Sequence, residues 1–178
     1  MILTHKTAER KRRNRIVYLG AFLIFAVSVL FPPDILTKSA LVHSVVETFA
    51  ACIPMIDVFA ARSVTPESAR LALSSLFIVT PLWAAPVIRL QAQLQDFSRT
   101  DARVLKFGWA LIVFLAFPWV VRPGTGTGRH TQFVDSLLEL GPIGAGCFAV
   151  LLYVTFLGCL TVSAMSLMFF FRKNRRSS

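Results

Sequence analysis

The sequence predicts an all-α, polytopic membrane protein with four transmembrane helices plus an outer amphipathic helix at the membrane interface. Two observations on composition indicate the membrane: 55% of the 178 residues are hydrophobic and 16% are charged, and the mean hydropathy is +0.65. Soluble domains average about 45–50% apolar and about 25% charged residues. The third observation is that most basic residues gather in three blocks, Lys6–Arg15, Arg89–Lys106 and Arg172–Arg176, between long uncharged runs. Residues 1–178 are therefore expected to form a single membrane domain.

Four uncharged runs are candidates for transmembrane helices. A helix needs about 20 mostly apolar residues to span ~30 Å of hydrocarbon, and a helix satisfies its own backbone in lipid. The four runs, called spans one to four, are Ile16–Phe31, Leu71–Ile88, Phe107–Val121 and Ile143–Phe171. Two prolines end span one, so its full range is 16–33. The first and third are short, so flanking arginine and lysine side chains must reach toward the headgroups. The fourth would rise about 43 Å, so it must tilt or project from the hydrocarbon.

The distribution of charge predicts the orientation. The side that holds residues 1–15, 89–106 and 172–178 carries 14 of the 19 Lys and Arg residues, and the outer segments 34–70 and 122–142 carry the other five. Because basic flanks resist translocation, both termini are expected in the cytoplasm of a bacterial inner (plasma) membrane. The first span lacks a small-residue cleavage site after Phe31, so we expect a retained anchor and not a signal peptide.

The first outer segment is too apolar for an ordinary loop. Its apolar residues recur at helical spacing: Leu41, Val42, Val45, Val46, Phe49, Ile53 and Ile56. Ile35–Ala61 is therefore expected to form an amphipathic helix, broken near Pro54, that rests on the membrane surface. A re-entrant or buried segment is the alternative, but His43, Glu47 and Asp57 would then need partners in lipid. Thr65 and Pro66 are predicted to be the cap and first residue of the next helix.

The second outer segment begins with the glycine-rich stretch 123–128, which predicts a flexible turn. A phosphate loop would require a Gly-Lys-Ser/Thr ending between a strand and a helix, and the stretch has neither. Residues Phe133–Leu140 are expected to form a short amphipathic turn that leads through Gly141 and Pro142 into the fourth span.

Catalytic, cofactor and metal sites are not predicted. The best candidate pair is His43 with Glu47, four residues apart on one helix face and open to His130 or Asp135 from the other outer segment, but a solvated surface pair is the simpler interpretation. No ionisable residue lies inside a span, which argues against a pump. Three cysteines without a C-x-x-C pair encode neither a disulfide framework nor a zinc site. We expect a protein that is not an enzyme and binds no nucleic acid.

Span four carries the residues that favour helix association in lipid. Thr155, Cys159 and Ser163 recur at every fourth position, and Gly158 and Ser166 lie beside this row. Small residues let helices approach closely, and hydroxyl groups bond across helices. The row therefore packs either against the other spans or against a second membrane protein. Membrane lipid and another membrane-embedded protein are the expected partners, with these five residues as the partner-binding surface.

The whole architecture resembles the inner-membrane immunity proteins of pore-forming bacteriocins, the colicin A type. The resemblance covers the four spans, the basic block Arg89–Lys106 and the basic tail Arg172–Arg176, and it brings no residue motif with it. It implies a protein that packs laterally against the apolar helical hairpin of a toxin and needs no catalysis. The alternatives are an accessory membrane subunit or exclusion protein of a conjugation or secretion apparatus and, third, a membrane-embedded enzyme that uses His43 and Glu47.

Overall fold

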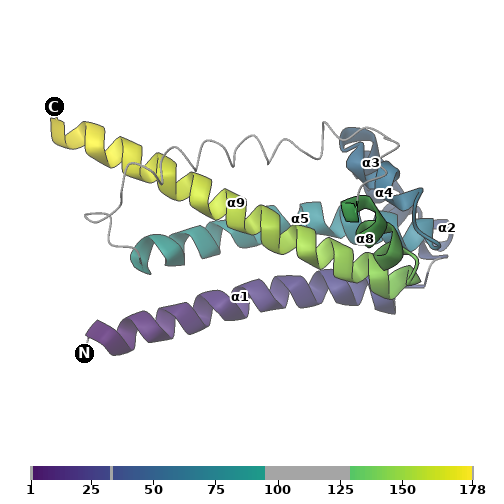
Figure 1. The fold of residues 1–178 in the computed structure, drawn as a ribbon, viewed down its shortest axis with the longest axis horizontal. Helices are drawn as coiled ribbons and strands as arrows, with labels where there is room; N and C mark the ends of the chain where they lie inside the picture. The colour runs from purple at the N-terminus through teal and green to yellow at the C-terminus, as the bar shows by residue number, and fades with distance from the viewer. Residues whose placement is uncertain (1, 33, 95–128, 178) are drawn as a thin grey trace.

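The computed structural model describes residues 2–32, 34–94 and 129–177, and the regular structure in these ranges is entirely helical. Three long helices lie side by side and contact one another: α1 (Ile2–Leu30), α5 (Pro66–Leu94) and α9 (Gly141–Ser177) (Figure 1). Within the described ranges, three stretches are long and apolar enough to cross a membrane, namely Thr7–Leu30, Pro66–Leu94 and Gly141–Phe169. The part of the chain that the structure describes is thus all-helical and contains three candidate transmembrane helices.

The three helices extend beyond the apolar runs that predicted them. Spans two and four lie inside α5 and α9, and span one lies in α1 except for its last residues, because α1 ends at Leu30; both α1 and α9 continue into basic sequence. Lysine, arginine, glutamate and alanine are good helix formers, so the helical backbone does not stop where the apolar run stops. The remaining run, Phe107–Val121, lies outside the described residues.

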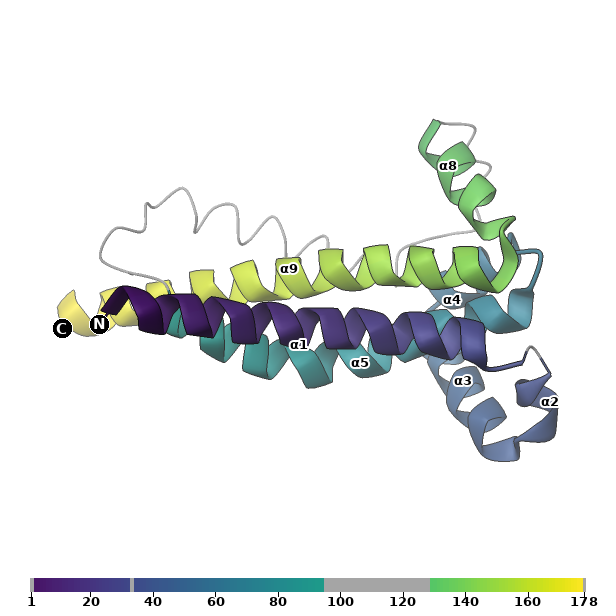
Figure 2. The same cartoon turned by 90° about the horizontal axis from the view of Figure 1, so that it is seen from below.

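Four short helices gather at the end of the bundle away from the two termini. They are α2 (Ile35–Lys38), α3 (Ala40–Cys52), α4 (Met55–Ala60) and α8 (Arg129–Leu138). Figure 2 shows α3 and α8 leaving this end in opposite directions. The bundle therefore has one end that carries the termini and another that carries the short helices.

The expected helix Ile35–Ala61 is broken twice. The break near Pro54 is confirmed, and a second break at Ser39 was not anticipated. Ser39 has extended backbone angles, and its hydroxyl accepts a hydrogen bond from the Val42 N–H group at 3.4 Å. A serine in this position satisfies a free N–H group of the first turn, so it starts a new helix and does not continue the old one.

The apolar side of α3 faces the long helices. Val46 and Ala50 are buried, and Ile53 follows at the end of the helix with 5% exposure. Leu41 lies at the free end of α3 and is 74% exposed. Val46 and Ile53 of the predicted apolar face are thus buried, whereas Leu41 and Val45 are exposed, and α3 contacts α4 and α5.

The predictions for the start of the helix after Thr65 and for the turn Phe133–Leu140 need correction. Thr65 occupies the cap position, since its carbonyl oxygen accepts the N–H group of Ala69 at 3.1 Å, but its buried hydroxyl has no hydrogen-bond partner among the described residues. The N–H group of Thr65 itself donates to the hydroxyl of Ser63 at 3.2 Å, a bond that stabilises the turn just before α5 and does not cap the helix. The amphipathic turn expected at Phe133–Leu140 begins earlier, as the ten-residue helix α8.

The turn from α8 into α9 depends on two glycines. Gly141 has a φ of +66°, a backbone conformation that glycine adopts without steric cost. Gly144 lies against the carbonyl of Leu137, where any side chain would overlap with the α8 backbone. The two helices can therefore pack closely across a short connection.

The three long helices meet at the centre of the bundle. Gly20 of α1 lies against the fully buried Tyr153 of α9 and close to Trp83 of α5. Nearer the short helices, the hydroxyl of Ser28 donates to the carbonyl oxygen of Pro142 at 2.6 Å and joins α1 to α9. Such hydrogen bonds between helices in lipid contribute about 0.6 kcal/mol on average, so close packing stabilises the bundle more than this bond does.

Apolar side chains also cover much of the outside of the bundle. The most exposed examples on the long helices are Tyr18, Leu19, Phe22, Leu30, Leu82, Ile143, Leu151 and Val154. Soluble monomers rarely expose an apolar surface of this extent. The outer surface of the three helices is thus suited to contact with lipid.

Candidate functional site: a lateral groove between the long helices

An apolar groove of about 330 Å³ is formed by α1, α5 and α9. We call it the lateral groove. Its walls are formed by Val17 and Tyr18 of α1, Val87 of α5, and Val154, Leu157, Gly158, Thr161 and Val162 of α9, and its polar end by Arg13, Asn14 and Gln91. Valine and leucine side chains dominate the surface, so the groove fits an apolar occupant.

A hydrogen-bonded cluster closes the polar end of the groove. The Nη1 group of Arg13 donates to Oε1 of Gln91 at 2.5 Å, which links α1 to α5. The Nε and Nη2 groups of the same guanidinium donate to Oδ1 of Asn14 at 3.3 and 3.0 Å. Arg13 is thereby fixed at the border of the apolar surface, where a long basic side chain can keep its charge in a polar region.

Gly158 is the position at which the groove is most open. A Cβ atom built at Gly158 would meet no atom within 4 Å in the part of the chain that the structure describes. Gly20, Gly144 and Gly146, by contrast, each lie against another helix. A glycine that has no neighbour among the described residues leaves room for the close approach of another helix.

The groove wall has no unsatisfied hydroxyl on α9. Thr161 donates its hydroxyl to the carbonyl oxygen of Leu157 at 2.7 Å within the same helix. This internal bond removes the cost of placing a hydroxyl group in an apolar environment. The α9 wall is therefore compatible with burial against a hydrophobic partner.

The structure divides the small-residue row that the sequence singled out. Gly158 lines the groove, and Thr155 is exposed beside it with its hydroxyl donating to the Leu151 carbonyl oxygen at 2.8 Å. Cys159, Ser163 and Ser166 are buried, with 7%, 5% and 5% exposure. The exposed and buried members of the row thus face different surroundings.

Sequence reasoning did not find the α1 and α5 walls of the groove. Val17, Tyr18 and Arg13 lie more than 130 residues from the α9 wall along the chain, and Gln91 lies 78 residues from Arg13. No spacing rule connects such positions. Only the packing of the three helices brings them together.

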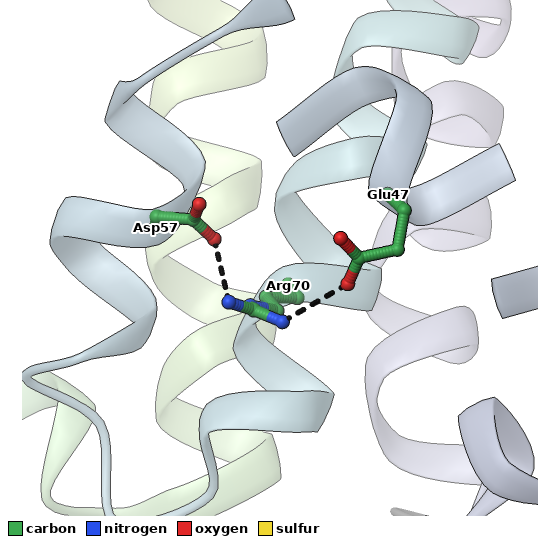
Figure 3. Close-up of polar contacts among 3 residues, drawn as sticks. All are labelled: Glu47, Asp57 and Arg70. Atoms are coloured by element: carbon green, nitrogen blue, oxygen red, sulfur yellow. Dashed lines mark hydrogen bonds and ion pairs between the residues drawn. The ribbon is translucent and has the colours of Figure 1, made fainter. Parts of the chain in front are cut away.

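Ion pairs at the end of the bundle with the short helices include Glu47 and Asp135, two candidate residues from the sequence analysis. Figure 3 shows Arg70 of α5 between Glu47 of α3, at 3.2 Å, and Asp57 of α4, at 2.9 Å. Asp135 of α8 pairs with Arg62 at 3.4 Å. All these side chains are about a quarter to a half exposed, so each pair contributes about 0–1 kcal/mol.

Glu47 and Asp135 therefore pair with two different arginines, Arg70 and Arg62. His43 is exposed on α3. In the described residues, no three His, Cys, Asp or Glu side chains are grouped so that they could hold a metal ion. The ion pairs thus connect α3 and α4 to α5, and α8 to the turn after α4. The lateral groove is the stronger candidate for a functional site.

No protein family matches the chain, and no curated protein or solved structure matches it either.

Proposed function

We propose that this chain is a protein of the bacterial inner membrane that crosses the bilayer four times, with both termini in the cytoplasm. The three long helices supply three crossings. The last described residue of α5, Leu94, and the first of α8, Arg129, lie at opposite ends of the bundle (Figure 1). If the long helices cross the membrane, the chain between these points must cross as well, and the uncharged run Phe107–Val121 provides the fourth span.

The orientation follows from the two ends of the bundle. The start of α1, the end of α5 and the end of α9 lie together at the end that carries the termini (Figure 1), and their sequences carry the basic residues. By the positive-inside rule this end faces the cytoplasm. The short helices then lie outside, with α3 at the interface, where the exposed Leu41 can contact lipid.

The function that the geometry supports best is recognition of another membrane protein by lateral helix packing, without catalysis. The observation that carries this proposal is the open Gly158 in the apolar lateral groove. Association in lipid depends on van der Waals packing, to which small residues contribute by allowing close approach. A transmembrane helix or hairpin from a partner satisfies this requirement.

Immunity to a pore-forming bacteriocin is the specific role that we propose. The four-span architecture with basic cytoplasmic ends resembles such immunity proteins, and their targets insert an apolar helical hairpin. Binding of that hairpin in the lateral groove would hold the toxin closed, provided that the groove binds the closed state more tightly than the open state.

An accessory or exclusion subunit of a conjugation or secretion apparatus is the second candidate. The exposed apolar residues on the short outer helices favour it, since Leu41 is 74% and Phe133 is 60% exposed. A partner outside the bilayer could contact these residues without entering the groove.

A protection assay tests the immunity proposal. The chain is expressed in cells that are sensitive to a pore-forming toxin, and the cells are challenged with that toxin; the toxin is chosen from a gene beside this one in the genome, if such a gene is found there. We expect survival at toxin concentrations that kill cells with an empty vector. Normal killing, with the protein present in the membrane at a normal level, would contradict immunity, and a neighbourhood of transfer or secretion genes would favour the second candidate.

A further inference from the structure

A second cavity, of about 500 Å³, lies between α1 and α5. It is separate from the lateral groove, since the two share no lining residue. Arg12 and Ile16 line it from α1, and Pro86, Arg89 and Leu90 line it from α5. The basic residues come from the parts of both helices that lie at the end of the bundle with the termini (Figure 1).

Two guanidinium groups converge on this cavity from different helices. Neither Arg12 nor Arg89 makes an ion pair or a side-chain hydrogen bond in the described part of the chain. Arg13, the neighbour of Arg12, differs in this respect because Asn14 and Gln91 accept its hydrogen bonds. The cavity therefore presents two cationic donors that have no acceptor among the described residues.

The other residues that line the cavity are apolar except for Gln93. Ile16, Pro86 and Leu90 form a hydrophobic surface directly beside the two arginines. A free inorganic anion would contact the guanidinium groups and leave this surface uncovered. A molecule with an anionic head and an apolar tail would cover both parts.

We propose that this cavity binds an anionic phospholipid of the cytoplasmic leaflet. Arg12 and Arg89 donate hydrogen bonds to the phosphate oxygens, and an acyl chain lies against Ile16, Pro86 and Leu90. Basic pockets between transmembrane helices on the cytoplasmic side are typical sites for anionic headgroups. The lipid joins α1 to α5, and its binding is independent of any partner in the lateral groove.

Lipid titration of the purified full-length protein tests the proposal. The protein in neutral detergent is titrated with phosphatidylglycerol or phosphatidylcholine, and bound lipid is counted by native mass spectrometry. We expect preferential binding of phosphatidylglycerol. The double variant Arg12→Gln/Arg89→Gln should bind it at least about tenfold more weakly, because two charge-assisted contacts are lost. Equal binding of the two lipids would overturn the proposal.

A matched variant separates a built site from general charge attraction. Arg10→Gln/Arg15→Gln removes two charges from the same end, and neither residue lines the cavity. This control should keep its affinity within about twofold, since the cavity is intact. Equal losses in the two double variants would show nonspecific attraction and overturn the site.

A change of shape tests the acyl-chain contact without a change of charge. Ala85 lines the cavity and Leu82 does not, although both are exposed on α5. Ala85→Phe should weaken phosphatidylglycerol binding, whereas Leu82→Phe should not. Inorganic phosphate at millimolar concentration should fail to displace the lipid. Full displacement by phosphate, or unchanged binding in Ala85→Phe, would indicate an anion site that does not use the apolar wall and would contradict a lipid site.

Discussion

Replacing Gly20 with leucine is expected to disrupt the packing of the three long helices. A side chain at position 20 would overlap with the hydroxyl end of Tyr153, and its Cβ atom would lie 3.2 Å from Cδ1 of Trp83. Tyr153 is fully buried and has little room to move away. Overpacking of a filled core costs about 1–3 kcal/mol or more. For a chain of this size we expect the melting temperature in detergent to fall by about 2–12 °C.

Tyr153→Phe is the matched test of the same contact. The Tyr153 hydroxyl is buried without a hydrogen-bond partner in the described residues, so its removal leaves no donor or acceptor unpaired. We expect this variant to unfold within about 2 °C of the wild type. The intrinsic fluorescence of the tryptophans follows both transitions. A stable Gly20→Leu protein, or a Tyr153→Phe protein as unstable as Gly20→Leu, would contradict the observed packing.

Gly158→Leu is expected to produce the opposite pattern, with lost function and retained stability. A leucine at position 158 enters the open groove and meets no described atom of its own chain at the Cβ position. It would block the close approach of a partner helix, and a loss of 1.4 kcal/mol in association already corresponds to about tenfold weaker binding. We therefore expect protection against the toxin to fall at least about tenfold at an unchanged membrane level.

Three further substitutions on α9 test which part of its surface contacts the partner. Leu151→Phe adds bulk at an exposed position outside the groove and should be silent. Thr155→Leu tests whether the partner follows the small-residue row beyond the groove, and we expect a smaller effect than at Gly158. Ser163→Leu should lower stability, because Ser163 is 5% exposed inside the protein. Normal protection by Gly158→Leu would place the recognition surface on the outer segments.

The long helices are predictable from the sequence because their signal is local. An uncharged run bounded by basic residues contains within itself the reason for spanning a membrane. Thus Leu71–Ile88 and Ile143–Phe171 lie in the long helices, as does Ile16–Phe31 up to Leu30, although the helix ends do not coincide with the ends of the runs. A helix continues as long as its residues favour helix, and several polar residues do so as well. The ends of an apolar run therefore do not mark the ends of the helix.

The lateral groove was not predictable in the same way. The row on span four pointed to Gly158, but it also included Cys159 and Ser163, which are buried. A period of four residues identifies one face of a helix and does not reveal what covers that face. The partners Val17 and Gln91 become neighbours of α9 only through the arrangement of three helices.

Side-chain caps were the weakest of the local predictions. Thr65 lies at the expected boundary, yet its hydroxyl has no hydrogen-bond partner among the described residues, and its own N–H group donates to Ser63 in the turn before the helix. Ser39 breaks a helix that the apolar spacing predicted to continue. Hydroxyl residues compete for backbone N–H groups within a few residues of each other, and their choice depends on the path of the chain.

Reporter fusions along the chain test the four-span topology, on which the groove and the lipid cavity both depend. A reporter that is active only outside the cytoplasm is fused after Ala61, Leu94, Thr127 and Ser178. We expect activity at Ala61 and Thr127 and no activity at Leu94 and Ser178, because 14 of the 19 basic residues belong to the cytoplasmic side. An active reporter at Ser178, or an inactive one at Thr127, would contradict the four crossings and the orientation.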